Sequence, residues 1–218
     1  MKEKYFTAEN IEQESNEMIE EVKYYSGMRM FKPDHGHIAL LVVDMQNYFL
    51  HPDEHAFVPS GPEVVPNILK IMKSCLGKEI PVILSRHVNT KEDAGMMGVR
   101  WHELIKENDP RSEIIEKIAS MGGELLKKSQ FDCFYETDLE QKLKDAGIRQ
   151  LIITGVMTNL CVESTARSAF IKGFEVVIPV DATAAYNYEF HLATFLNIAY
   201  MFTRPMKSQA LIDLLKNA

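Results

Sequence analysis

RQLIITGVMTNLCVESTARSAFIKGFEVVIPVD, residues 149–181, places two short apolar runs on either side of a helix-like stretch. The runs at 149–155 and 175–181 are apolar at consecutive positions, which is typical of strands buried on both faces of a sheet. Gly173 follows the helix that we expect over 159–172, as a glycine at a helix end commonly does. A strand, a helix and a second strand in this order predict a parallel βαβ unit.

The same alternation of apolar runs and amphipathic stretches continues along most of the chain. The other elements that we expect are strands at 37–44, 80–86 and 123–128 and helices at 62–77, 111–121, 138–146, 189–203 and 207–216. Gly77 and Gly147 follow two of these helices, where glycine caps a helix end. The order predicts an α/β fold with a doubly wound, mostly parallel sheet flanked by helices on both faces.

Residues 1–36 stand outside this pattern, and we expect them to form an N-terminal helical extension ahead of one large domain, 37–218. Capping residues at 7–10 precede the helix, and a loop follows at 29–36. Before Gly27, apolar residues recur at helical spacing: Ile11, Met18, Ile19, Val22 and Tyr25. We expect this stripe to pack on its own domain, and exchange with a neighbouring subunit or a cover over the site are the alternatives.

The composition excludes several classes of partner. The chain has 218 residues and a formal net charge of -7, with acidic and basic residues mixed, so no basic surface for nucleic acid or an anionic membrane is expected. Its three cysteines, Cys75, Cys133 and Cys161, show no CxxC spacing and predict neither a disulfide framework nor a zinc ribbon. The polar N-terminus resembles no signal peptide, and no apolar run approaches the roughly 18 residues of a membrane span. We expect a cytoplasmic protein.

Polar residues end several of the apolar runs, and ligands of open parallel sheets bind beyond the carboxyl ends of the strands. Asp44 leaves the run ALLVVD directly, Lys128 closes ELLKK, and Cys161 lies in the loop after RQLIITG. A carboxylate that leaves a buried run needs a partner or a function. Phe131 and Phe134 follow the lysine and would keep water out. We therefore expect a carboxylate, an ammonium and a thiol in one pocket.

These three groups have a chemical logic as a nucleophilic site. A free thiol is mostly protonated at pH 7, and it is activated by a base or by a cationic environment at a helix N-terminus. Cys161 lies in the first turn of the helix expected to start near 158–159, Asp44 can accept its proton, and Lys128 balances the charge. The backbone N–H groups of Met157 and Cys161 would receive an oxyanion, and one such donor is worth about 3 kcal/mol in a transition state.

Each residue also has a purely structural interpretation. Alone, Asp44 would be a carboxylate bonded to backbone amides, and Lys128 would be a solvated surface lysine. Cys75 and Cys133 are expected to be inert buried thiols. Asp181 is expected to be a structural acid in the turn after its strand.

Two motifs carry a family resemblance: ALLVVDMQNYF (39–49) and KSQFDCFYETDLEQKLKDAGIRQLIITGVMTNLCVESTARSAFIKGFEVVIPVDATAAY (128–186). From about 37 to 205 the chain resembles the isochorismatase-like cysteine hydrolase superfamily. That superfamily includes nicotinamidases, N-carbamoylsarcosine amidohydrolase and the ureidoacrylate and biuret hydrolases. The resemblance implies its three-layer α/β fold and a homo-oligomer, a dimer or a tetramer.

The resemblance also assigns catalytic residues. The family's triad of Asp, Lys and Cys falls on Asp44, Lys128 and Cys161. In the family, the lysine lies four residues before a position that is usually Ser. Here Asp132 holds that position, and counting back from it selects Lys128 over Lys127.

Further features around the triad follow from the resemblance. A cis peptide bond would join Val156 to Met157 and turn the Met157 N–H toward the substrate oxygen. Phe49 should line the substrate pocket. From elsewhere in the chain, Trp101 and Tyr186 are additional aromatic candidates for substrate binding.

The histidines bear on two alternative chemistries, a cysteine–histidine pair and a bound metal. A cysteine–histidine pair would need His87, the one histidine at a strand end. Metal-binding nicotinamidases of the superfamily carry Asp-x-His after the second strand, where this chain has SRH at 85–87, so we expect no metal and no other cofactor. His51 and His55 have the spacing of a helical metal pair, but Pro52 favours a loop at the surface.

By this resemblance we expect a hydrolase of non-peptide C–N bonds: a cysteine-dependent amidohydrolase that cleaves a small carboxamide, carbamoyl or ureido compound through a thioester. The sequence leaves the substrate open, because specificity lies in the loops at 45–60, 87–105 and 181–191. One alternative is an isochorismatase-type vinyl-ether hydrolase, whose members generally lack the nucleophilic cysteine. The other is a non-catalytic binding or assembly protein, which would not need all three triad residues.

Overall fold

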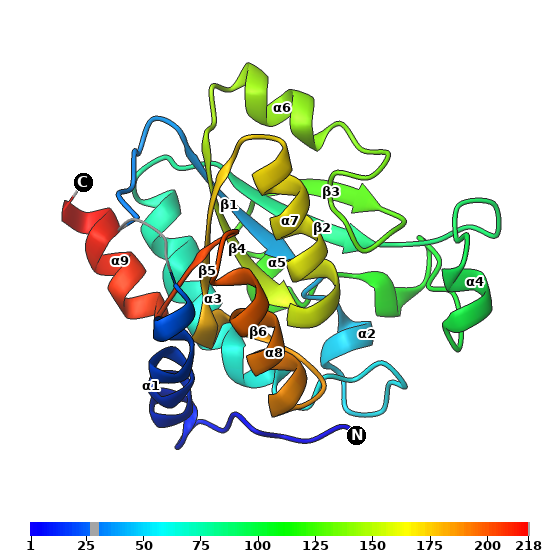
Figure 1. Cartoon of the computed structure of the whole chain (residues 1–218). Coiled ribbons are helices and arrows are strands. Elements are labelled where there is room, and N and C mark those ends of the chain that lie inside the picture. The colour runs from blue at the N-terminus through cyan, green and yellow to red at the C-terminus, as the bar shows by residue number, and fades with distance from the viewer. Residues whose placement is uncertain (27–30, 218) are drawn as a thin grey trace.

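The computed structural model describes residues 1–26 and 31–217, and a parallel sheet forms its centre (Figure 1). The strands are β1 (Ile38–Val43), β2 (Val82–His87), β3 (Glu124–Lys128), β4 (Gln150–Val156), β5 (Glu175–Pro179), β6 (Thr183–Ala184) and β7 (Arg204–Met206). They lie in the order β3-β2-β1-β4-β5-β7, and β6 pairs with β4. Every pair of these described strands is parallel, which confirms the sheet predicted from the sequence.

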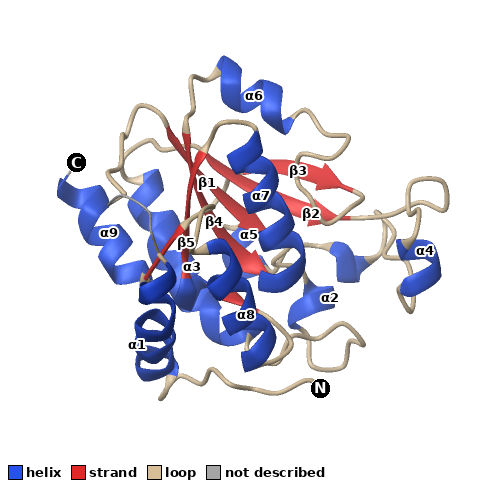
Figure 2. Cartoon of the chain, in the orientation of Figure 1, coloured by secondary structure: helices blue, strands red, loops and turns tan. Residues whose placement is uncertain are grey.

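Helices cover both faces of the sheet (Figure 2). The helices are α1 (Ile11–Val22), α2 (Asn47–Leu50), α3 (Gly61–Leu76), α4 (Met97–Arg100), α5 (Glu116–Ala119), α6 (Leu139–Asp145), α7 (Glu163–Ile171), α8 (Tyr188–Ile198) and α9 (Ser208–Asn217). Neighbouring residues of β1 enter different cores: Leu40 packs with residues of α3 and α9, and Leu41 with residues of α6, α7 and α8. The strand is therefore buried on both sides, as its unbroken apolar run predicts.

The prediction of a helix at 111–121 is wrong for most of that segment. The segment holds a 3-10 turn (Pro110–Ser112) and the four residues of α5. The buried guanidinium of Arg86 accounts for the difference, because it donates to the Ser112 carbonyl at 2.9 Å and pairs with Glu113 at 2.7 Å. These side-chain bonds hold the segment as a loop.

The helix expected at 189–203 is too long at its C-terminal end. In the structure α8 ends at Ile198, and the chain continues into the short strand β7. Pro205 lies within that strand, where it pairs with Ile178 of β5. Proline has no N–H to donate and is tolerated there, because β7 is the last strand of the sheet.

The N-terminal extension packs on its own chain. Met18 and Val22 of α1 are buried in the core to which α7 and α8 contribute, and Tyr5 is buried in the opposite core. Four residues of the apolar stripe therefore pack on their own domain, the first of the three arrangements considered above, whereas Tyr25 is 55% exposed. Gly27 and the first two residues of the loop expected at 29–36 lie outside the described residues. No helix within the described ranges is long and apolar enough to cross a lipid bilayer.

Candidate active site

Three strand ends bring the expected triad together. Asp44 follows β1, Lys128 is the last residue of β3, and Cys161 lies in the turn after β4. These strands are near neighbours in a parallel sheet, so their carboxyl ends meet at one edge. The Nζ of Lys128 lies 2.8 Å from Oδ2 of Asp44 and 3.5 Å from Sγ of Cys161. One ammonium thus contacts both the carboxylate and the sulfur.

Asp44 is fully buried and held from both its side chain and its backbone. The hydroxyl of Ser85 donates to Oδ1 at 2.6 Å and accepts the Asp44 N–H at 3.1 Å. The φ angle of Asp44 is 51°, in the left-handed region that few non-glycine residues adopt. Ser85 on β2 therefore fixes one carboxylate oxygen, and the other oxygen faces Lys128. This partner was not predicted from the sequence.

The Lys128 side chain has no solvent exposure. Its Nζ also donates to the Gln130 carbonyl at 2.9 Å. Burial lowers the pKa of the ammonium, but the Asp44 carboxylate and the nearby cysteine sulfurs together outweigh burial and raise that pKa. Lys128 is therefore a fixed cation. By contrast, the Lys127 side chain is 48% exposed and pairs with Glu107, which agrees with the choice of Lys128 from the sequence.

Cys161 lies in a single π-helical turn (Thr158–Val162) that runs into α7. The residue is only 4% exposed. Burial raises the pKa of the thiol well above its ordinary value, the Lys128 charge lowers that pKa, and the Asp44 charge raises it. The resting thiol is therefore protonated, which corrects the expectation that a cationic helix N-terminus lowers its pKa. Burial and the carboxylate outweigh the ammonium.

The backbone ahead of Cys161 has the form that the resemblance implies. The peptide bond between Val156 and Met157 is cis. The Met157 carbonyl accepts the N–H groups of Leu160 and Val162, which flank Cys161, at 3.1 and 3.2 Å. The oxyanion role of the Met157 and Cys161 N–H groups stays a prediction.

His87 lies beside Lys128 and does not hydrogen-bond Cys161 among the contacts of the described residues. Its Nε2 is 2.8 Å from Oδ1 of Asn89, and its Nδ1 is 3.5 Å from the Lys128 Nζ. Burial and the Lys128 charge lower the pKa of His87 to about 4. The neutral ring thus donates Nε2–H to Asn89 and presents an unprotonated Nδ1 to the ammonium. This geometry favours a carboxylate base over a cysteine–histidine pair.

The three aromatic candidates lie in different surroundings. Phe49 is buried, and its ring contacts Tyr48 at 5.3 Å in a core that also contains Met157. The Trp101 ring lies 6.2 Å from Phe131, which is three residues after Lys128 in the chain. The Tyr186 hydroxyl donates to the Ala56 carbonyl at 3.4 Å, and the Lys2 ammonium lies 4.6 Å from the centre of the Tyr186 ring. Substrate binding by all three stays a prediction.

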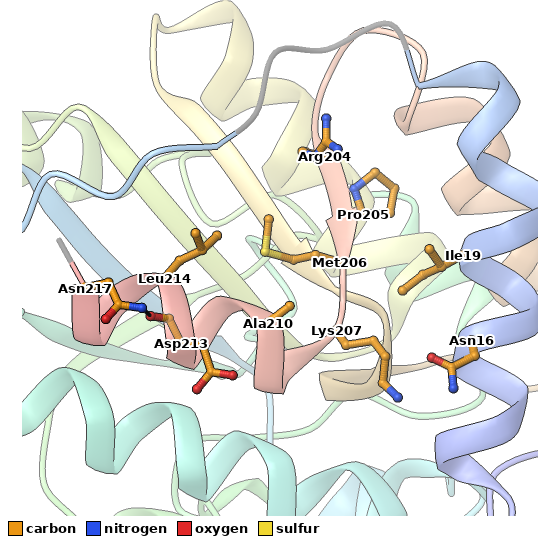
Figure 3. Close-up of a pocket in the computed structure, with 10 residues that line it drawn as sticks. All are labelled: Asn16, Ile19, Arg204, Pro205, Met206, Lys207, Ala210, Asp213, Leu214 and Asn217. Atoms are coloured by element: carbon orange, nitrogen blue, oxygen red, sulfur yellow. Dashed lines mark hydrogen bonds between the residues drawn. The ribbon is translucent and has the colours of Figure 1, made fainter.

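Two cavities lie in different parts of the molecule. One, of about 610 Å³, is lined by Gln130, Phe131 and Asp132, the residues that soon follow Lys128. Another, of about 470 Å³, lies between α1 and α9 (Figure 3). None of the triad or expected substrate residues lines the second cavity, so it is separate from the triad.

Comparison with known proteins identifies the family of the chain. The family model described as the isochorismatase domain matches residues 38–210. The chain belongs to the isochorismatase family. The resemblance predicted from the sequence is confirmed, and with it the assignment to a family of hydrolases.

Several members of the isochorismatase family are similar over most of the chain. Nicotinamidase 3 of Arabidopsis thaliana is 38% identical over 170 residues, which cover 75% of this chain and 81% of that protein. N-carbamoylsarcosine amidase of Arthrobacter sp is 29% identical over 150 residues, which cover 65% of this chain and 57% of that protein. A crystal structure of a cysteine hydrolase from Pseudomonas syringae pv. phaseolicola 1448A superposes with a TM-score of 0.83 at 25% identity, covering 86% of this chain and 96% of that one.

The position that metal-binding nicotinamidases fill with Asp is Ser85 in this isochorismatase-family chain, and its hydroxyl is bonded to Asp44. No cluster of three or more His, Cys, Asp or Glu suited to a metal occurs among the residues that the structure describes. Nδ1 of His55 lies 2.9 Å from the Tyr48 hydroxyl, and His51 is exposed. These residues do not fit a metal of that kind.

Proposed function

We propose that this chain is a cysteine-dependent amidohydrolase that cleaves the C–N bond of a small carboxamide, carbamoyl or ureido compound. One observation carries the proposal: the buried Nζ of Lys128 lies 2.8 Å from the Asp44 carboxylate and 3.5 Å from the Cys161 sulfur. Acyl transfer through a thioester requires a thiol and a base within reach of it, and a fixed cation balances the charge. The amidase and nicotinamidase relatives support amides as the substrate class.

In the first half of the reaction, the Asp44 carboxylate accepts the thiol proton while the Cys161 sulfur bonds to the substrate carbonyl carbon. The carbonyl oxygen gains negative charge, and the Met157 and Cys161 N–H groups are its proposed donors. The intermediate then collapses and the C–N bond breaks. The nitrogen leaves as ammonia or an amine with the proton that Asp44 held, and a thioester remains on Cys161.

In the second half, water attacks the thioester carbon and gives a proton to Asp44. The C–S bond breaks, the acid leaves, and the Cys161 sulfur recovers the proton from Asp44. Lys128 stays protonated throughout and offsets the negative charge as it passes between oxygen and sulfur. No step uses a metal or another cofactor.

A panel of carboxamides, carbamates and ureas tests the proposal by ammonia release. Wild-type protein is expected to release ammonia from at least one compound, and Cys161→Ala is expected to release none. Cys75→Ala is the matched control, because that buried thiol lies on α3 and should leave turnover near the wild-type rate. Full turnover by Cys161→Ala would rule out the covalent route.

Two other results would favour the alternatives. Hydrolysis of a vinyl ether that persists in Cys161→Ala would indicate isochorismatase-type chemistry, which needs no nucleophilic thiol. A wild-type protein that binds a small amide and never hydrolyses it would indicate a binding protein. The homo-oligomer and the cytoplasmic location expected from the sequence stay predictions.

A further inference from the structure

The N-terminal arm, residues 1–7, lies against the loop that leads into α8, and in Figure 1 it runs past that helix. The Glu3 N–H donates to the Tyr186 carbonyl at 2.8 Å, and the Asn187 side chain donates to the Met1 carbonyl at 2.8 Å. The arm precedes the region that the family model matches, 38–210. The arm therefore lies outside the matched family region, and it is bonded to a loop expected to contribute to specificity.

Tyr5 is an arm residue whose side chain contacts the buried His191. Its backbone N–H bonds the Ser60 hydroxyl at 3.1 Å, and its ring is 8% exposed. Its own hydroxyl accepts the Ala185 N–H at 2.9 Å and lies 2.8 Å from Nδ1 of His191. Because the oxygen already accepts one proton, its own proton is free to be donated to His191.

His191 is a fully buried histidine that the proposed mechanism does not use. Burial lowers its pKa to about 3, and a backbone contact at Val180 opposes this only in part, so the ring is neutral. Its Nδ1 lies 2.8 Å from the Tyr5 hydroxyl and 3.1 Å from the Thr158 hydroxyl. Both hydroxyl contacts fall on Nδ1, and Nε2 has no hydrogen-bond partner among the described residues, so Nδ1 is the ring nitrogen that links Tyr5 to Thr158.

Thr158 is the first residue of the turn that carries Cys161, and it is fully buried. It follows Met157 directly, so it lies between the proposed oxyanion donor and the nucleophile. The hydroxyl chain from Tyr5 through His191 thus ends on the turn that places the Cys161 sulfur 3.5 Å from Lys128. Displacement of a reacting group by about 1 Å can slow a reaction by about two orders of magnitude.

We propose that Tyr5 is a positioning residue: through His191, its hydroxyl holds Thr158 and thereby fixes the turn that presents Cys161 to Asp44 and Lys128. The proposal rests on the proposed function, in which Cys161 is the nucleophile. The proposal gives the N-terminal arm a part in the reaction, although the arm lies outside the matched family region. Removal of this one hydroxyl should loosen the turn and leave the rest of the fold in place.

Tyr5→Phe removes the hydroxyl and keeps the ring. Tyr25→Phe is the matched control, because Tyr25 belongs to the same extension and is 55% exposed. The first readout is amide hydrogen exchange in the peptide around 157–163. The second is the rate at which iodoacetamide labels Cys161 in the full chain, with Cys75 and Cys133 as internal references for general unfolding.

Tyr5→Phe is expected to speed exchange in the turn peptide and to speed Cys161 labelling by about 3- to 10-fold, with Cys75 and Cys133 unchanged, because a looser turn exposes the thiol and relieves the burial that raises its pKa. Thr158→Val should reproduce both effects, and Thr158→Ser, which restores a hydroxyl, should return the labelling rate most of the way to wild type. In the double variant Tyr5→Phe with Thr158→Val, the two effects should not add, because both changes break one chain. The control Tyr25→Phe should match wild type in both the exchange of the turn peptide and the labelling of Cys161.

Unchanged exchange in the turn, or unchanged or slower labelling of Cys161 in Tyr5→Phe, would overturn the proposal. Faster labelling of all three cysteines would also overturn it, because that pattern reports general unfolding. The two proposals fail separately. If Cys161→Ala releases ammonia at the wild-type rate, the proposed function loses its nucleophile, and the exchange of the turn in Tyr5→Phe still decides the positioning role.

Discussion

The Nζ of Lys128 lies 2.8 Å from Oδ2 of Asp44, and neither side chain has any exposure to solvent. A buried pair of this kind is a weak source of net stability, because desolvation of the two charges offsets their attraction. Removal of one partner is costly, however, since it leaves the other charge buried alone. The pair is therefore better explained by the third group it contacts, the Cys161 sulfur, than by a contribution to folding.

Lys128→Met should destabilise the protein by about 3–5 kcal/mol, because it leaves the Asp44 carboxylate buried without its cation. Urea unfolding at neutral pH measures this change. Lys127→Met is the matched control: the neighbouring side chain is 48% exposed, and its surface pair with Glu107 contributes little. Its free energy of unfolding should stay within about 0.5 kcal/mol of wild type. Equal losses of unfolding free energy in the two variants would contradict the assignment of Lys128 as the cation that neutralises buried Asp44.

Gly155→Ala should destabilise the fold by more than about 4 kcal/mol or prevent folding. A Cβ at this position would lie 2.0 Å from the Val43 carbonyl oxygen, and the backbone of β1 cannot withdraw without breaking its ladder to β4. Gly173→Ala separates this clash from backbone strain. Gly173 has a φ of 90° with no atom within 4 Å of the added Cβ, so the expected loss is about 1–2 kcal/mol. Denaturant unfolding and soluble yield compare the two, and similar losses would exclude the close approach as the cause.

The sheet could be predicted because β1, β4 and β5 are buried on both faces and read as continuous apolar runs. The helix at 111–121 could not be excluded from the sequence, because its absence depends on the distant side chain of Arg86. Strand β7 was missed because Pro205 argues against a strand wherever its place at the sheet edge is unknown.

Some residues of the site could likewise be predicted from the sequence, and others could not. Asp44 could be singled out because it ends an apolar run, where a charge is out of place. Lys128 was selected over Lys127 by the family resemblance, because the run ELLKK does not distinguish the two lysines. Ser85 was missed, although a hydroxyl inside the buried run ILSR was a signal that a polar partner lies nearby. Tyr5 carried no signal, because nothing in its segment tells which loop the arm will contact.

His191 should make the protein less stable as the pH falls from about 6.5 toward 3. Burial lowers its folded pKa to about 3, whereas the unfolded chain titrates near 6.5, so the unfolded state binds more protons in this window. The stabilising contribution is present above the unfolded pKa and is lost toward the folded pKa. Between pH 7 and pH 5, His191→Gln should lose about 1–2 kcal/mol less stability than wild type in urea unfolding.

The control for this pH dependence is His51→Gln, which removes a histidine whose side chain is 59% exposed and should leave the wild-type slope unchanged. His87 is present in both variants, and its pKa of about 4 contributes the same slope to each. A slope in His191→Gln as steep as in wild type would show that the ring is already charged in the folded protein.

Asp44→Asn should change two properties of Cys161 in opposite directions. Burial and the Asp44 charge raise the pKa of the thiol and the Lys128 charge lowers it, so loss of the carboxylate removes one cause of the raised pKa and leaves burial as the main opposition to the cation. The thiolate fraction at pH 8 should grow, and iodoacetamide labelling should speed up by several-fold, about tenfold for each unit that the pKa falls. Ammonia release should nevertheless drop by at least about 100-fold, because no base remains to take the proton.

Asp181→Asn is the matched control for this last variant. Asp181 is also a buried carboxylate, but it accepts from Ser208 at the start of α9 and from Asn67 on α3, and it contacts no triad residue among its hydrogen bonds. In Asp181→Asn, the rate of Cys161 labelling and the rate of ammonia release should both stay near wild type. If Asp44→Asn instead labels more slowly than wild type, the carboxylate promotes formation of the thiolate in the resting site. The buried thiol would then already be ionised before substrate binds, and Asp44 would not be the group that takes its proton during attack.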